Sequence, residues 1–243
     1  MAADYASWSP YNYVLGNPIS NIDPDGMRVE TDYYSESGKL LKSTNDGSND
    51  VVIVSNGYDR GIFNMNLAAF EKAGNIDMAG ANSVLRQSGQ AYDVDAFSAF
   101  FDANEGDIET QNSDGSPTHE DMDGNRVEVA NEHATFLYPN ENGVITTGTE
   151  NIQGSSSGHI PADRLVPSRS GNVGTLHTHP AQGKGLLYNK GEGQYSQNRN
   201  EGMPSRFDRV NHAPSSGRSV ITTKTEHVFF NKSGGFFGVP RKN

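Results

Sequence analysis

Two histidines one residue apart form the part of the sequence best suited to metal chemistry. His177 and His179 stand in the run Gly-Thr-Leu-His-Thr-His-Pro at residues 174–180. In an extended strand, residues i and i+2 point to the same face, so both imidazoles can meet at one point. Two neutral histidine ligands can begin a zinc site, although a pair of packed or surface histidines has the same spacing. Pro180 ends the strand, because proline cannot donate a hydrogen bond to a neighbouring strand.

A serine and an aspartate further along the chain supply the other groups that such a site needs. Ser205 and Asp208 stand in the run Pro-Ser-Arg-Phe-Asp at residues 204–208. Taken alone, Ser205 is a helix N-cap and Asp208 complements the positive end of that helix. Taken with the histidines, Asp208 offers a third metal ligand and Ser205 a nearby hydroxyl. His212 is a candidate fourth ligand or nuclease-type base, or else a surface histidine or one that packs beside the ligands.

The order His-x-His-Pro, spacer, Ser-x-x-Asp resembles the signature of the JAB/JAMM metalloproteases. The resemblance covers about residues 126–231. It implies that His177, His179 and Asp208 bind Zn²⁺, that Ser205 donates a hydrogen bond to the oxyanion, and that the reaction is hydrolysis of a peptide or isopeptide bond. The spacer is longer than is usual in that family. Its excess, residues 182–202, is rich in Gly, Asn, Gln and Tyr and is either an insertion or a lid over the site.

The same resemblance implies a glutamate upstream that acts as general base. Glu132 is the first choice, because it precedes Ala134–Tyr138, a strand-like run similar to the one that follows the glutamate in the family. Glu128 is the second choice. Glu150, in a polar loop, is the third.

The N-terminal segment carries a second resemblance on separate residues. Residues 11–26 contain Asn-Pro and Asp-Pro-Asp-Gly turns after a Tyr-rich stretch. Over about residues 5–27 the chain resembles the end of the core region of Rhs/YD-repeat proteins, with Asp23 and Asp25 at the positions of acidic residues used for self-cleavage. This resemblance implies that the rest is the toxin of a larger secreted effector, delivered to the cytoplasm of a target cell. It also implies a cognate immunity protein as partner, and together with the JAB/JAMM resemblance it implies a protein substrate in the target cell.

The elements that must position these residues follow from the local patterns. Residues 28–34, 39–42 and 51–55 predict a small antiparallel meander, and the apolar spacing over 64–104 predicts three short helices. In the clearest of these, Asp93–Asn104, Asp93 caps the helix and three phenylalanines form one face. The acidic residues 105–125 predict a linker, and they do not fit a calcium-binding EF-hand loop. Further strands are expected at 126–130, 134–138, 144–147, 173–177, 219–223 and 227–230.

The sequence therefore predicts an α+β fold in three parts. Residues 1–27 are the end of an Rhs core region, and 28–125 are an extension with the meander and short helices. Residues 126–243 are a JAB/JAMM-like domain with a mixed sheet and flanking helices.

Composition narrows the function classes. The chain has 243 residues, no cysteine and a formal net charge of −11. Cysteine-type zinc sites and thiol catalysis are excluded, and the negative charge disfavours a nucleic-acid partner. No apolar run approaches the about 18 residues of a membrane-spanning helix.

Other motifs argue against other enzyme classes. Residues 154–158 match Gly-x-Ser-x-Gly formally but lack the strand and helix of a serine-hydrolase elbow, and a Walker-type phosphate loop is absent from the sequence. Two alternatives to the peptidase stay open. One is a metal-dependent nuclease toxin that uses His177, His179, Asp208 and His212. The other is a non-catalytic binding module held together by its metal.

Overall fold

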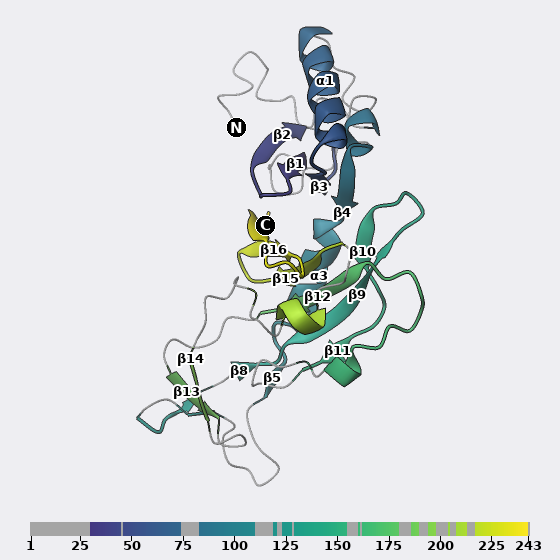
Figure 1. Cartoon of the computed structure of the whole chain (residues 1–243). Helices are drawn as coiled ribbons and strands as arrows, with labels where there is room; N and C mark the ends of the chain where they lie inside the picture. Colours follow the sequence, from purple (N-terminus) through teal and green to yellow (C-terminus); the bar gives the residue numbers. More distant parts are fainter. Residues whose placement is uncertain are drawn as a thin grey trace, which may run out of the picture. The chain divides into compact units, whose positions relative to one another are not determined.

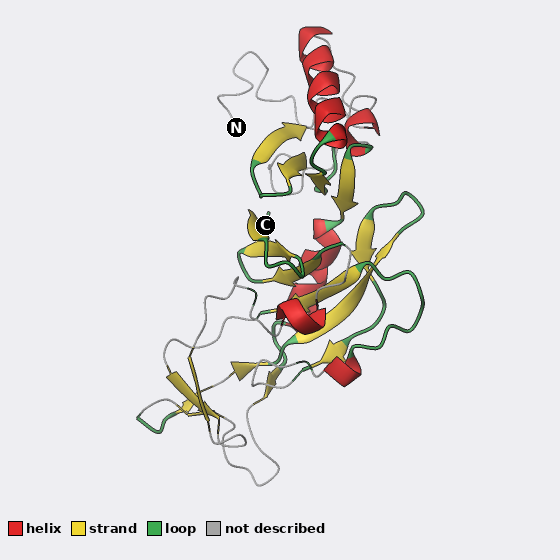
Figure 2. Ribbon diagram, viewed as in Figure 1, coloured by secondary structure: helices red, strands yellow, loops and turns green. Residues whose placement is uncertain are grey.

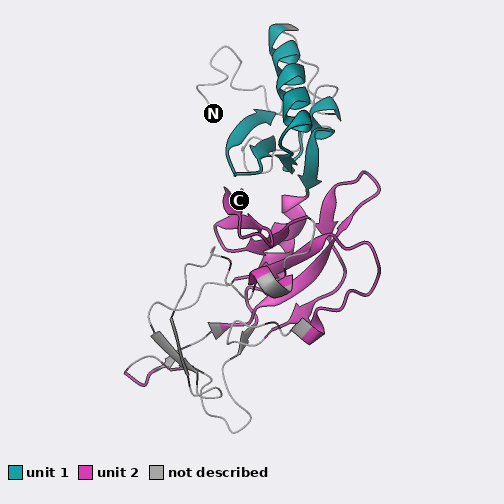
Figure 3. Cartoon of the chain, in the orientation of Figure 1, with its two compact units in different colours: residues 1–92 teal, residues 93–243 magenta. Residues whose placement is uncertain are grey.

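The chain divides into two compact units. In the computed structural model these are Met1–Tyr92 and Asp93–Asn243, coloured teal and magenta in Figure 3. The second unit includes α3 (Val94–Asn104), which lies within the predicted extension. The predicted division of the chain between residues 27 and 28 and between residues 125 and 126 stays a prediction. The structure describes residues 30–44, 46–73, 83–109, 119–120, 123–127, 129–154, 160, 162–179, 186–189, 194–197, 204, 208–212 and 217–242. The predicted Rhs segment, 1–27, lies outside these residues.

The first unit is a four-stranded sheet with one long helix. Its strands lie in the order β2-β1-β3-β4, and its helix α1 packs on the sheet through Phe63, whose ring lies 5.3 Å from that of Tyr33. Residues 83–86 are also helical. The bounds are β1 Thr31–Ser35, β2 Leu40–Thr44, β3 Val51–Val54, α1 Tyr58–Ala73 and β4 Gly89–Tyr92.

The predicted antiparallel meander is wrong in one pairing. β1 and β2 are antiparallel, but β3 pairs with β1 in parallel instead of following β2. The turn after β2 returns the chain to the far side of β1, because the Asp46 carboxylate accepts hydrogen bonds from the backbone N–H and the hydroxyl of Thr31. Arg86 then bridges Asp46 and Asp50, which fixes the entry to β3.

The second unit is built on a mixed sheet, which confirms the broad α+β prediction (Figures 1 and 2). Its strands lie in the order β17-β16-β15-β12-β9-β10, and the short β11 pairs with β9. β12 is parallel to β15 and antiparallel to β9. The strand bounds are β9 His133–Pro139, β10 Ile145–Thr147, β11 Ile152–Gln153, β12 Gly174–Thr178, β15 Ser219–Thr222, β16 Glu226–Phe230 and β17 Phe236–Pro240.

Helix α3 covers one face of this sheet. As predicted, Asp93 caps it by accepting a hydrogen bond from the Ala96 N–H at 3.0 Å. Phe97 and Phe101 are fully buried, whereas Phe100 is only partly buried. The helix packs against β10, β12 and β15. The opposite face of the sheet carries the candidate site.

Short strands also occur where irregular chain was expected. β6 lies in the predicted acidic linker and pairs with β13, which lies in the long spacer. Together with β7 and β14 they form a small sheet in the order β14-β13-β6-β7. A two-stranded sheet pairs β5 with β8. The bounds are β5 Ile108–Glu109, β6 His119–Glu120, β7 Arg126–Val127, β8 Val129–Ala130, β13 Leu186–Asn189 and β14 Gln194–Gln197.

Two short helical turns complete the second unit, η2 at Ala162–Arg164 and η3 at Asp208–His212. Across the described part of the chain, every helix is too short or too polar to cross a membrane.

Candidate metal centre

The candidate centre forms around His177, in the middle strand of the sheet. β12 lies between β9 and β15, so the His177 side chain is fully buried, with its ring 6.0 Å from that of Phe230. Neither ring nitrogen has a hydrogen-bond partner among the described residues. Each buried polar atom left unpaired costs about 1–3 kcal/mol, so an imidazole kept in this state indicates a missing partner that accepts its lone pair.

His179 follows directly after the strand and keeps the strand's direction. Its backbone N–H donates to the Thr222 carbonyl on β15 at 2.9 Å, so the extended conformation continues past the end of β12. The two imidazoles therefore lie on one face, as the His-x-His spacing predicts, with ring centroids 4.9 Å apart.

Asp208 approaches from the other side, at the start of η3, a single turn of π-helix. Such turns are rare and are often found at functional sites. The last carbonyl of this turn, that of His212, accepts hydrogen bonds from the hydroxyls of Thr175 on β12 and Ser219 on β15. The turn is thereby fixed to the two strands that flank it. The His212 ring packs 4.5 Å from the His177 ring.

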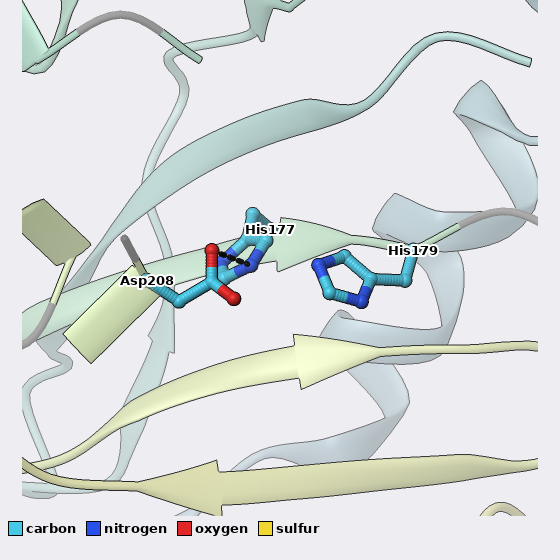
Figure 4. A group of neighbouring side chains, drawn as sticks. All are labelled: His177, His179 and Asp208. Atoms are coloured by element: carbon cyan, nitrogen blue, oxygen red, sulfur yellow. Dashed lines mark ion pairs between the residues drawn. The ribbon is translucent and has the colours of Figure 1, made fainter. Parts of the chain in front are cut away.

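The three side chains have the spacing of a metal site (Figure 4). One ligand atom from each of His177, His179 and Asp208 lies within 4.8 Å of the other two. Zinc with ligands at 2.0–2.2 Å in a tetrahedron separates those ligands by about 3.4 Å. His177 Nε2 and Asp208 Oδ1 are 3.5 Å apart, close to that separation. The residues present fit a metal ion.

Glu132 reaches the same face because of the strand register. His177 pairs with Ala134 and Leu176 with Thr135 across β12 and β9, and the same register carried two residues further places Glu132 opposite His179. The Glu132 Oε1 atom lies 3.6 Å from His179 Nε2. Side chains that are opposite in an antiparallel pair share a face, so the carboxylate borders the metal cluster.

The environment of Glu132 makes its carboxyl group unusual. Burial raises the pKa of Glu132 from 4.5 to about 7, the charge of His177 opposes this shift, and the charge of Asp208 adds to it. A carboxyl group with a pKa near neutrality can both accept and release a proton under working conditions.

The other predicted site residues have different positions. Glu150 is outside the cluster: its carboxylate accepts hydrogen bonds from Tyr138, at the far end of β9 from Glu132, and from Ser168. Ser205 and Glu128 lie outside the described residues. Thr175 and Ser219 hold the Asp208 turn but were not predicted. A single hydroxyl residue on a strand belongs to no sequence motif that would indicate such a role.

Comparison with known proteins adds no information to this geometry. No protein-family model, curated protein or solved structure matches the chain.

Proposed function

We propose that the chain is a zinc-dependent peptidase of the JAB/JAMM type, which hydrolyses peptide or isopeptide bonds. The observation that carries this proposal is the position of Glu132, a buried carboxyl group 3.6 Å from His179 on the rim of the His-His-Asp cluster. A metal site with a purely structural role requires only the residues that bind the ion. A hydrolytic site needs in addition a group that moves a proton, and Glu132 lies where that group is required.

The donor set supports zinc in preference to the hard cations. Mg²⁺ and Ca²⁺ prefer oxygen ligands throughout, whereas two imidazoles and one carboxylate suit zinc. Three protein ligands leave one coordination position open, as in catalytic zinc sites. When bound there, the ion would supply a Lewis acid that lowers the pKa of water and polarises the scissile carbonyl.

The protein's own residues would carry the remaining steps. Glu132 would take one proton from the attacking water as the new C–O bond forms. It would return that proton to the amine nitrogen as the C–N bond breaks, so the carboxylate is regenerated in each turnover. Ser205, by the family resemblance, would donate a hydrogen bond to the carbonyl oxygen as negative charge develops. Burial of His177 and Asp208 would strengthen each of these electrostatic interactions by excluding water.

The biological setting is part of the same proposal. The N-terminal resemblance to the border of an Rhs core supports a toxin that is delivered to a target cell, acts on a protein in its cytoplasm, and is neutralised by an immunity protein. Its residues, 5–27, are separate from those of the peptidase signature, so the two resemblances support each other independently.

A nuclease is the second candidate, because the His212 ring lies beside the His177 ring. Cleavage of plasmid DNA or RNA on addition of metal, unaffected by Ser205→Ala, would favour it. Against it stand the net charge of −11 and the place of Glu132.

New protein N-termini in bacterial cells that express the chain provide the test of the peptidase. The parent should generate new termini that are absent with Glu132→Gln, while Glu150→Gln, a matched change outside the cluster, should behave as the parent. Equal toxicity and an equal set of termini for the parent and Glu132→Gln would instead indicate a non-catalytic module.

A further inference from the structure

A polar network lies directly behind Glu132, on the face of the sheet opposite the metal cluster. Neighbouring residues of an extended chain point to opposite faces, so Asn131 and His133 face away from the cluster that Glu132 borders. Both of them donate to the same atom. His133 Nε2 lies 2.7 Å from Asp107 Oδ2, and Asn131 Nδ2 lies 3.4 Å from it. One carboxylate therefore binds the residue before Glu132 and the residue after it.

The backbone around Glu132 is held at three successive points. The Asn131 N–H donates to the Asp107 carbonyl at 2.8 Å, and the Glu132 carbonyl accepts from the Gly154 N–H at 2.6 Å. The His133 N–H donates to the Thr178 hydroxyl at 2.9 Å. Thr178 stands between the two histidine ligands, so this last bond ties the glutamate segment directly to the ligand strand.

The orientation of the amides in the network fixes where the protons of His133 lie. Asn104 Nδ2 donates to the Phe100 carbonyl at 2.7 Å, so its Oδ1 faces Asn151. Asn151 Nδ2 donates to that Oδ1 at 2.9 Å, so its own Oδ1 faces His133 Nδ1 at 2.7 Å. An amide oxygen only accepts hydrogen bonds. Nδ1 of His133 must therefore carry a proton.

The other ring nitrogen of His133 faces an acceptor as well. Burial alone would raise the pKa of Asp107, but hydrogen bonds from His133, Asn131 and Gln153 together hold it below its ordinary value. An ionised carboxylate cannot donate, so the hydrogen bond at 2.7 Å between the two side chains runs from His133 Nε2 to Asp107 Oδ2. Both ring nitrogens of His133 thus face acceptors, the Asn151 amide oxygen on one side and the Asp107 carboxylate on the other.

We propose that Asp107 is a positioning residue that holds Glu132 against His179 by hydrogen-bonding both of its chain neighbours, Asn131 and His133. This inference rests on the proposed function only for the catalytic role given to Glu132. Asp107 itself touches no reacting atom. Its effect passes through the backbone of residues 131–133, which is fixed from behind while the glutamate side chain stays free to move a proton.

A double-mutant cycle in the metal-free protein tests this proposal without a substrate. The readout is the imidazole Cε1–H resonance of His179, which senses the charge of Glu132 at 3.6 Å. Glu132→Gln should shift this resonance in the parent. In an Asp107→Ala background the same change should produce less than about half of that shift, because the two residues are coupled.

The control is Asp102→Ala, an aspartate of α3 that pairs with Arg241 instead. In that background the full His179 shift should remain. A second readout is the imidazole of His133, which should show two ring N–H resonances in the parent and lose the protection of its Nε2 proton in Asp107→Ala. The Asp107 side chain is partly exposed, so we expect the variant to fold. If it does not, Asp107→Asn replaces it and should show a smaller loss of coupling.

The two proposals fail in different ways. An equal His179 shift in the parent and Asp107→Ala backgrounds, or a single ring N–H on His133, would overturn the positioning role. A chain that shows the coupling but cleaves no protein would overturn the peptidase and leave the positioning of Glu132 standing.

Discussion

Above neutral pH, the buried carboxylate of Glu132 should make the metal-free protein less stable than a variant with an uncharged side chain at this position. Replacing Glu132 with glutamine keeps the shape of the side chain and removes its charge. In the folded chain the pKa of Glu132 is about 7, against 4.5 when exposed. The folded state therefore binds this proton more tightly than the unfolded state.

The sign and size of the effect follow from proton linkage. The contribution of Glu132 to stability is fully present below pH 4.5 and is lost as the pH rises towards 7. Each pKa unit corresponds to about 1.4 kcal/mol, so the cost of the ionised group above pH 7 is about 3 kcal/mol. Glu132→Gln should recover most of this free energy of unfolding at about pH 8 and almost none of it at about pH 4.

Chemical denaturation in the presence of a chelator, at a series of pH values, measures this difference. The matched control is Glu150→Gln, because the pKa of Glu150 is lowered by its hydrogen-bond donors although burial alone would raise it. That change should show no gain above neutral pH. Added zinc should narrow the difference between the parent and Glu132→Gln, since the positive ion beside Glu132 favours its ionised form in the parent, whereas the variant has no charge there to stabilise. An equal difference in stability between the parent and Glu132→Gln at both pH values would contradict a raised pKa for Glu132.

Three further predictions concern the framework of the second unit. His227 is fully buried between α3 and the sheet, and burial together with the charge of Arg241 lowers its pKa from 6.5 to about 3. Its stabilising contribution should therefore be lost as the pH falls below 6.5, so the stability advantage of the parent over His227→Gln should shrink by about 1.4 kcal/mol per pH unit between about pH 6 and 4. An advantage that stays constant over this range would refute the prediction. Ser219→Ala removes a hydrogen-bond donor to the His212 carbonyl and so loosens the turn that carries Asp208. Calorimetry should then show about tenfold weaker zinc binding. Unchanged affinity would show that this hydrogen bond does not position Asp208. Asp93→Ala should cost about 1 kcal/mol through loss of the α3 cap, read by thermal unfolding, with zinc affinity preserved.

The local elements of the second unit could be predicted from sequence, because their patterns are local. The strands β9, β12 and β16 begin and end within about two residues of the expected positions, and the helix that Asp93 caps is where the sequence indicates. The last strand, β17, was not predicted. Gly238 and Pro240, both of types depleted in strands, interrupt its short apolar run.

Strand partners and register could not be predicted from local patterns. The parallel pairing of β3 with β1 depends on hydrogen bonds from the turn after β2, which no periodicity indicates. The position of Glu132 depends on the register between β9 and β12. A register shift of one residue would turn its side chain to the other face of the sheet. In the sequence, Glu132 is the first choice of general base only through the family resemblance. The strand register shows why its carboxylate lies beside His179.

For the metal cluster too, local spacing could be predicted from the sequence, whereas contacts between distant segments could not. The spacing of His177 and His179 predicts that they share a face, and the structure brings them together with Asp208. The network of Asp107 and His133 could not be found in the sequence, because its members come from separate segments and belong to no motif.

The zinc content of the purified protein tests the central claim most directly. The parent, the His177→Ala/His179→Ala double variant and Glu132→Gln would each be dialysed against a weak chelator and analysed for metals. We predict one zinc ion per chain in the parent and in Glu132→Gln, and none in the double variant. A parent without zinc, or a double variant that keeps it, would contradict the assignment of the His-His-Asp cluster as a zinc centre.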